Sequence, residues 1–179
     1  MGNSVRILPH YTYNDYVNWE GQWELIQGIP YAMSPLPVPN YQRIGGNLIS
    51  EFRQQMKKCR HCNVYQPIDY HIAEDTIIQP DILVVCGKIE KKFLDFTPAL
   101  VVEILSPATA LKDRHSKYGI YESQQIKYYL IVSPDVEEVE VFELVNKEYS
   151  LQQKGHDFSF KFSFDEDCTA TISFKEIWQ

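Results

Sequence analysis

The feature that most constrains this fold is a pair of short apolar segments on either side of a helical pattern. Leu100–Leu105 and Lys127–Ser133 are rich in Val, Ile and Leu, which is typical of strands buried on both faces. The residues between them, Ala108–Gln124, have the pattern of a helix. A strand–helix–strand unit makes its two strands parallel through a right-handed crossover. We therefore predict a sheet that contains this parallel pair.

The other periodic segments predict a mixed sheet flanked by helices, an α/β fold of the α+β type. Ile44, Leu48, Phe52 and Met56 recur every four residues, which predicts a helix over Asn40–Lys58. Shorter links suggest antiparallel pairing for the remaining strands. A short helix is expected at Thr12–Asp15, and further strands at Trp23–Gln27, Pro30–Met33, Asn63–His71, Ile77–Val85, Val136–Val145, Tyr149–Gln153 and Thr169–Phe174.

Length and charge set limits on the function. The 179 residues and 21.0 kDa fit a single domain over residues 1–179. There is neither an apolar run long enough for a membrane span nor an apolar leader, so we expect a cytoplasmic protein with no membrane partner. The net charge of −7 argues against a protein that coats nucleic acid by bulk electrostatics. It does not exclude a nuclease, because carboxylates that hold cations also lower the net charge.

The four cysteines leave two interpretations open. Cys59 and Cys62 have the spacing of half a zinc site, whereas Cys86 and Cys168 stand alone in the sequence. A structural zinc site needs four ligands, usually supplied as two such pairs. We therefore expect free thiols in a reducing compartment and keep zinc binding as the alternative.

Two carboxylates occur inside segments that otherwise read as buried strands. Asp81 precedes Ile-Leu-Val-Val, and Glu103 lies within Leu-Val-Val-Glu-Ile-Leu. A buried carboxylate is costly unless it is paired, hydrogen-bonded or bound to a cation. Alternation places each on one face of its strand, so the two side chains meet if those faces coincide. Together with a backbone carbonyl, that of Ile104, they would suit Mg²⁺; an exposed or salt-bridged strand end is the alternative.

A third charged residue follows in the predicted helix. Asp113, Lys117 and Tyr121 are spaced by four residues and would share one helix face. Because this helix must pack back over the sheet, its inner face could bring the Lys117 ammonium to the carboxylates. A solvated Asp113–Lys117 pair is the alternative.

Several of these segments, taken in order, resemble a known family. They are Glu24-Leu-Ile-Gln-Gly28, Pro80-Asp81, Glu103-Ile-Leu-Ser106-Pro107, Asp113-Arg114 with Lys117, and Tyr128-Tyr-Leu-Ile-Val132. The chain resembles the Uma-two family of restriction-endonuclease-like proteins, within the PD-(D/E)XK nuclease superfamily, from about Thr12 to Val145. The resemblance implies a restriction-endonuclease-like core of helix, three strands, helix and strand, with extra β elements at both ends.

The resemblance also implies roles for individual residues. Asp81 matches the Asp of the Pro-Asp motif, and Glu103 matches the acidic residue of the (D/E)XK motif. Leu105 stands where that motif has its lysine, so the resemblance assigns the lysine to Lys117 in the following helix. Glu51, in the first long helix, matches a further acidic metal ligand.

The implied function is a DNA endonuclease that depends on Mg²⁺ or Mn²⁺. Lys112 and Arg114 are the expected DNA contacts, with Lys57, Lys58 and Arg60 adding to a basic rim. A nuclease-fold module that binds DNA or protein without cleavage is the main alternative. The net charge favours it, as does the sequence Asn40–Gln42, where the family often has a His. A dimerisation or partner protein, including a homodimer, that pairs through the hairpin at Val136–Gln153 is the third.

Overall fold

A computed structural model describes residues 9–33, 38–106 and 112–179. The described elements in chain order are α1 (Tyr13–Tyr16), β1 (Trp23–Ile26), β2 (Ile29–Ala32), α2 (Pro39–Gln55), β3 (Cys62–Tyr65), β4 (Tyr70–Ala73), β5 (Thr76–Ile78), β6 (Ile82–Cys86), β7 (Leu100–Ile104), the π-helix η1 (Lys112–Lys117), α3 (Tyr118–Ser123), β8 (Tyr128–Ser133), β9 (Glu138–Val145), β10 (Glu148–Gly155), β11 (Ser159–Ser163), β12 (Thr169–Ser173) and the 3-10 helix η2 (Phe174–Trp178).

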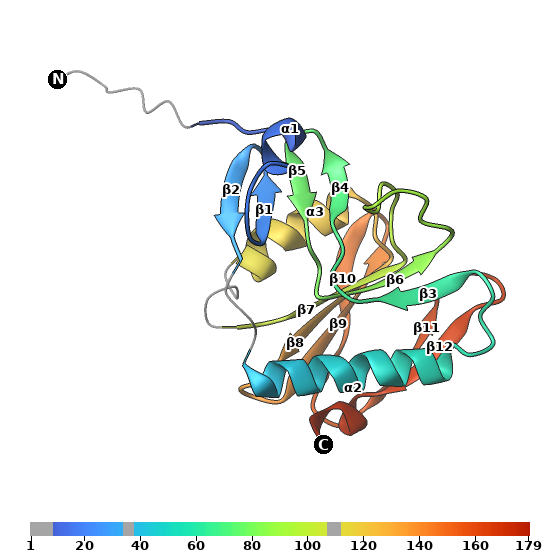
Figure 1. The fold of residues 1–179 in the computed structure, drawn as a ribbon. Helices are drawn as coiled ribbons and strands as arrows, with labels where there is room; N and C mark the ends of the chain where they lie inside the picture. Colours follow the sequence, from blue (N-terminus) through green and yellow to red (C-terminus); the bar gives the residue numbers. More distant parts are fainter. Residues whose placement is uncertain (1–8, 34–37, 107–111) are drawn as a thin grey trace.

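A six-stranded mixed sheet forms the centre of the molecule (Figure 1), which confirms the predicted mixed α+β class. Its order is β10-β9-β8-β7-β6-β3, and β7 pairs with β8 in parallel while its other neighbours pair antiparallel. The parallel pair is the one that the sequence predicts. A four-stranded sheet of order β2-β1-β5-β4 and the hairpin β11-β12 complete the strands.

The central sheet has a different cover on each face. Helix α2 packs on one face through Ile44, Leu48 and Phe52, in a cluster that also contains the β11-β12 hairpin. Tyr121 of α3 belongs to the cluster on the other face, together with residues of the four-stranded sheet. In Figure 1 this smaller sheet and α3 lie on the side of the central sheet away from α2. Side chains of β7 alternate between the two clusters, so Glu103 points towards α3 and the four-stranded sheet.

Two predicted strands are in fact divided between sheets. The segment Asn63–His71 breaks into β3 and β4, and Ile77–Val85 breaks into β5 and β6. Pro67 and Pro80 lie in the two breaks, and proline cannot donate to a sheet ladder. The chain therefore leaves the central sheet after β3, builds β4 and β5 in the smaller sheet, and returns as β6.

The expectation of free thiols is wrong for this structure. Disulfides join Cys59 to Cys168 and Cys62 to Cys86. Cys62 and Cys86 face each other across neighbouring strands, because β3 pairs with β6. The Cys-x-x-Cys motif is thus split between two partners that lie far away in the sequence.

The predicted helix over Ala108–Gln124 differs from the structure in its geometry. Residues 107–111 lie outside the described part, and the chain from Lys112 to Lys117 is a π-helix that continues into α3. The four-residue rule that would stack Asp113 on Lys117 holds for α-helices, whereas a π-turn bonds residue i to i+5. Among the described helices, none is long and apolar enough to cross a membrane.

Candidate active site

Lys117 forms a buried ion-paired group with two glutamates. Its Nζ lies 2.8 Å from Glu24 Oε1 and 2.9 Å from Glu103 Oε1. The exposed fractions of the three side chains are 2% for Lys117, 0% for Glu24 and 2% for Glu103. The alternative of a solvated Asp113–Lys117 surface pair is therefore wrong. Lys117 meets Glu103, as its place in the sequence predicts, and it also meets a second acid.

Tyr121 is a further member of this group. Its hydroxyl donates a hydrogen bond to Glu103 Oε1, the same oxygen that Lys117 contacts. Burial of the phenol, together with the nearby Glu103 carboxylate, holds the Tyr121 pKa well above its usual value. The phenol therefore stays protonated and serves as a hydrogen-bond donor. Two donors from one helical segment thus fix the Glu103 carboxylate.

Asp81 is tied to the backbone beside Glu103. Its Oδ2 accepts a hydrogen bond of 2.7 Å from the Ile104 amide. In the β6–β7 register Ile82 pairs with Val102, so the next positions, Asp81 and Glu103, are opposite one another. Residues opposite each other in an antiparallel pair have Cβ atoms about 4.5–5.5 Å apart. Both acids lie at the same edge of the sheet, where β6 begins and β7 ends, and Asp81 is half-buried rather than enclosed.

Glu24 reaches the group through the β1-β2 hairpin. Gln27 and Gly28 both have positive φ angles, 51° and 76°, as a two-residue turn with the right-handed twist of a hairpin requires. The hairpin pairs with β5, and Glu24 Oε1 also accepts a 3.0 Å hydrogen bond from the Gln79 amide. The smaller sheet thus places a carboxylate above the central sheet, facing Glu103.

A comparison with known proteins identifies the relatives of this chain. The sequence profile of the Uma2 family, described as "Putative restriction endonuclease", matches residues 11–163. The chain belongs to the Uma2 family. An uncharacterized protein of Synechocystis sp. (strain PCC 6803), slr1290, is 36% identical over 66 residues, which span 35% of either chain.

A solved structure agrees with this Uma2 fold over almost its whole length. It is the crystal structure of a putative nuclease belonging to DUF820 from Anabaena variabilis, with a TM-score of 0.74. The match covers 93% of this chain and 97% of the other, at 18% sequence identity. The TM-score demonstrates a shared fold, whereas the low identity leaves the activity open.

Not every residue that the sequence predicts joins the group. Glu51 lies on α2, on the opposite face of the central sheet, where its Oε1 accepts a 3.4 Å hydrogen bond from the Ser173 amide. The structure therefore does not bring Glu51 to Glu103 as a metal ligand. Lys112 and Arg114 fall in η1, but their side chains lie outside the described part, so their DNA contacts stay predictions.

Sequence reasoning missed Glu24 as a member of the site, although its signal is present. The strand Trp23-Glu24-Leu25-Ile26 places an acid within an apolar run, as in the strands of Asp81 and Glu103. A carboxylate that is completely buried requires a partner, and here that partner is Lys117. Applied evenly, the rule that singled out Glu103 would also have singled out Glu24.

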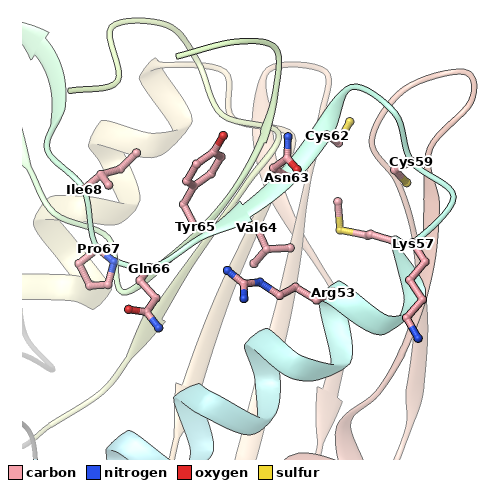
Figure 2. Close-up of a pocket in the computed structure, with 11 residues that line it drawn as sticks. Arg53, Lys57, Cys59, Cys62, Asn63, Val64, Tyr65, Gln66, Pro67 and Ile68 are labelled. Carbon is pink, nitrogen blue, oxygen red and sulfur yellow. The ribbon is translucent and has the colours of Figure 1, made fainter. Parts of the chain in front are cut away.

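A groove runs along the outer edge of the central sheet, between β3 and the end of α2 (Figure 2). It has a volume of about 860 Å³, and two cations, Arg53 and Lys57, are among its lining residues. No carboxylate lines it among the described residues. Figure 2 shows Arg53 extending from α2 towards β3. The groove does not include the Lys117 group, but its Tyr65–Ile68 end lies next to the strand end that carries Asp81.

Proposed function

We propose that this Uma2 protein is a metal-dependent endonuclease that hydrolyses DNA phosphodiester bonds. Its fold would be a restriction-endonuclease-like core, with Asp81, Glu103 and Lys117 as the catalytic residues. The observation that carries the proposal is the contact between Lys117 and Glu103 beside Asp81. Residues from two neighbouring strands and a following helix converge there at one sheet edge. Membership of a family described as "Putative restriction endonuclease" agrees with this assignment.

The donor set fits a hard divalent ion such as Mg²⁺ or Mn²⁺. The Asp81 and Glu103 carboxylates and the Ile104 carbonyl would hold the ion, because such ions prefer oxygen ligands. Asp81 is held in place by the Ile104 amide, and Glu103 by Lys117 and Tyr121. When bound, the ion would polarise the scissile phosphate and activate a water molecule. Its position at a half-buried sheet edge would leave one side open to a phosphate.

Lys117 would supply the fixed positive charge of the site. An ammonium close to the scissile group stabilises negative charge that develops on the phosphate and orients the attacking water. Glu24 would act as a positioning residue, because it binds Lys117 from the side of the smaller sheet. Two carboxylates on one ammonium restrict its movement, which favours a preorganised charge.

The groove along β3 offers a path for the DNA backbone. Arg53 and Lys57 would contact phosphates, and Lys58 and Arg60 are exposed at the same end of α2. These cations are distant from Glu103: Gly45 on α2 lies next to Ile104, whereas the cations lie around the end of α2 at Gln55, which about 15 Å of helix separate from Gly45. A strand following the groove would connect this basic end with the catalytic edge.

A binding module without cleavage is the second candidate. The observation that favours it is the burial of Glu24, Glu103 and Lys117, whose charges satisfy one another away from solvent. A substrate phosphate would have to gain access to Lys117. The two candidates predict the same DNA contacts and differ in whether the bound strand is cut.

The decisive experiment compares the wild type with Glu103→Gln in plasmid nicking with Mg²⁺ or Mn²⁺. We expect the wild type to nick DNA and the variant to nick it about 100-fold more slowly or worse. Removal of other charge-stabilising groups has an effect of this size. Calorimetric titration with Mn²⁺ should show weaker binding for Glu103→Gln and for Asp81→Asn. Lys117 is buried, so Lys117→Ala should destabilise the fold as well as remove the charge. Lys117→Arg, which keeps the charge, is therefore the better probe of the role of Lys117.

Glu140→Gln is the matched control for loss of a buried acid. Glu140 lies in β9 of the same sheet, is 7% exposed, and pairs with Lys154 rather than with Lys117. It should retain full nicking. A wild type that binds DNA in a salt-dependent manner and never cuts it would support the binding module instead. Equal nicking by Glu103→Gln and the wild type would exclude this catalytic site.

A further inference from the structure

A second cluster of metal-ligating side chains lies at the far end of β6. Cys62 of β3, Cys86 of β6 and Asp165 of the β11–β12 loop place their ligand atoms within 4.8 Å of one another. Asp81 precedes the first residue of β6 and Cys86 is its last, so roughly 16 Å of strand separate this cluster from the proposed catalytic edge. The cluster is therefore independent of the site described above.

The contact between Asp165 and Cys62 points to a cation. Asp165 Oδ2 lies 3.3 Å from Cys62 Sγ, but a disulfide sulfur carries no proton to donate. Two electron-rich atoms thus face each other without a hydrogen between them. In the described part of the chain, no lysine or arginine pairs with Asp165. Its other oxygen, Oδ1, accepts a 2.9 Å hydrogen bond from the Asp167 amide, which fixes the direction of Oδ2.

We propose that Cys62, Cys86 and Asp165 form a zinc site once the Cys62–Cys86 disulfide is reduced. A dithiol reductant would supply two electrons and two protons, giving two thiols and its own disulfide. Zn²⁺ would then displace the two thiol protons and bind both thiolates and the carboxylate, with water as the fourth ligand. Thiolate sulfur favours Zn²⁺ over the hard ions that suit Asp81 and Glu103.

The geometry requires only side-chain movement. Tetrahedral zinc at ordinary bond lengths holds a sulfur and an oxygen ligand about 3.5–3.7 Å apart. The Cys62–Asp165 contact is close to that separation, and the two sulfurs must part from their bonded distance. The pairing of β3 with β6 keeps the two cysteines opposite each other after reduction. Zinc would then replace the disulfide as the link between β3 and β6, and Asp165 would join the β11–β12 loop to both strands.

This assignment differs from the Cys-x-x-Cys pair that the sequence suggests. Cys59 is bonded to Cys168, and these two sulfurs do not belong to the cluster around Asp165. The structure therefore assigns the second half of the motif, Cys62, to a site with Cys86 and Asp165. Cys59 and Cys62 both line the groove beside β3, which Figure 2 shows, and while Cys62 is buried, Cys86 and Asp165 are half-buried.

The test measures zinc binding by the full chain before and after reduction. We expect the reduced protein, freed of reductant, to bind one Zn²⁺ in competition with a chromophoric chelator, and the oxidised protein, which offers only the oxygen ligands of Asp81 and Glu103, to bind zinc far more weakly. Substitution with Co²⁺ should give thiolate charge-transfer absorbance for two sulfurs. Zinc should also protect Cys62 and Cys86 from alkylation, as read by peptide mapping. Equal zinc binding by the oxidised and reduced proteins would overturn the proposal.

Two variants separate this ligand set from its competitors. Asp165→Asn should weaken zinc binding by about tenfold or more, whereas Glu166→Gln, an exposed neighbour with the same change of charge, should not. The double variant Cys59→Ser/Cys168→Ser should still bind zinc. Loss of zinc in that double variant would assign the ion to the Cys-x-x-Cys pair. If Asp165→Asn binds zinc as tightly as the wild type does, Asp165 is not a zinc ligand. The cobalt spectrum of the wild type provides a test that does not depend on how a variant folds.

Discussion

Lys117 Nζ lies 2.8 Å from Glu24 Oε1, although the two residues come from distant parts of the chain and from different layers of the fold. Their side chains are 2% and 0% exposed, so the pair is removed from solvent. Glu103 completes the group from the central sheet. One ammonium therefore links the small four-stranded sheet, the helical segment and strand β7, and its loss should affect both stability and the proposed activity.

Lys117→Ala should lower the free energy of unfolding by about 3–5 kcal/mol, because it leaves two buried carboxylates without their cation. Urea denaturation followed by circular dichroism measures this. The control is Lys88→Ala, which breaks an exposed pair with Glu90 and should leave the midpoint unchanged. Adding Glu24→Gln to Lys117→Ala should recover part of the loss. A small and equal effect of both lysine variants would contradict the buried pairing.

Glu24→Gln should lower kcat of the proposed nuclease and leave KM for DNA and the affinity for Mn²⁺ nearly unchanged. The reason is that Glu24 contacts Lys117 and the Gln79 amide and would act through the position of the ammonium. Steady-state nicking kinetics and calorimetry provide the three quantities. Glu140→Gln again serves as the control, with all three unchanged. A fall in Mn²⁺ affinity in Glu24→Gln would show that Glu24 is instead a metal ligand.

The protein should lose stability as the pH rises above about 10. Burial raises the pKa of the phenols of Tyr121, Tyr149 and Tyr16 above the usual 10.0, with nearby carboxylates adding to the effect. The folded state therefore keeps protons that the unfolded state releases. Its stability is fully present below pH 10 and falls as the pH rises from there towards the raised folded values.

Urea midpoints measured between about pH 8 and 11 should show this decline, and Tyr121→Phe should make it shallower. In the native protein, part of the 12 tyrosines should resist ionisation until unfolding, as read from tyrosinate absorbance. A flat pH profile, or ionisation of all tyrosines in the folded protein, would be incompatible with the buried phenols.

Two adjacent glycines of α2 should respond differently to substitution by alanine. A Cβ on Gly46 would meet nothing within 4 Å, so Gly46→Ala should stabilise the protein by about 0.5–1 kcal/mol through helix propensity. A Cβ on Gly45 would lie 3.2 Å from Ile104 Cδ1, so Gly45→Ala should gain less or destabilise. Thermal unfolding of both variants checks this. Equal stabilisation would show that Ile104 moves freely.

The sequence predicts well what depends on local pattern. The four-residue spacing from Ile44 to Met56 predicts α2, and apolar runs on either side of a helix predict the parallel β7–β8 pair. Charged residues in buried strands also mark Asp81 and Glu103, because an acid in such a place needs a partner wherever the rest of the chain lies. The contact between Lys117 and Glu103 follows from the helix returning over the strand that precedes it.

Only the tertiary structure decided which distant segments meet. Nothing local shows that Asn63–His71 supplies strands to two sheets, that Cys62 faces Cys86, or that Glu51 turns towards Ser173. The periodicity of the sequence alone determines which face of a strand is apolar. Strand partners, and with them the placement of Glu24 over Lys117, result from the sum of many long-range contacts, which no single segment encodes.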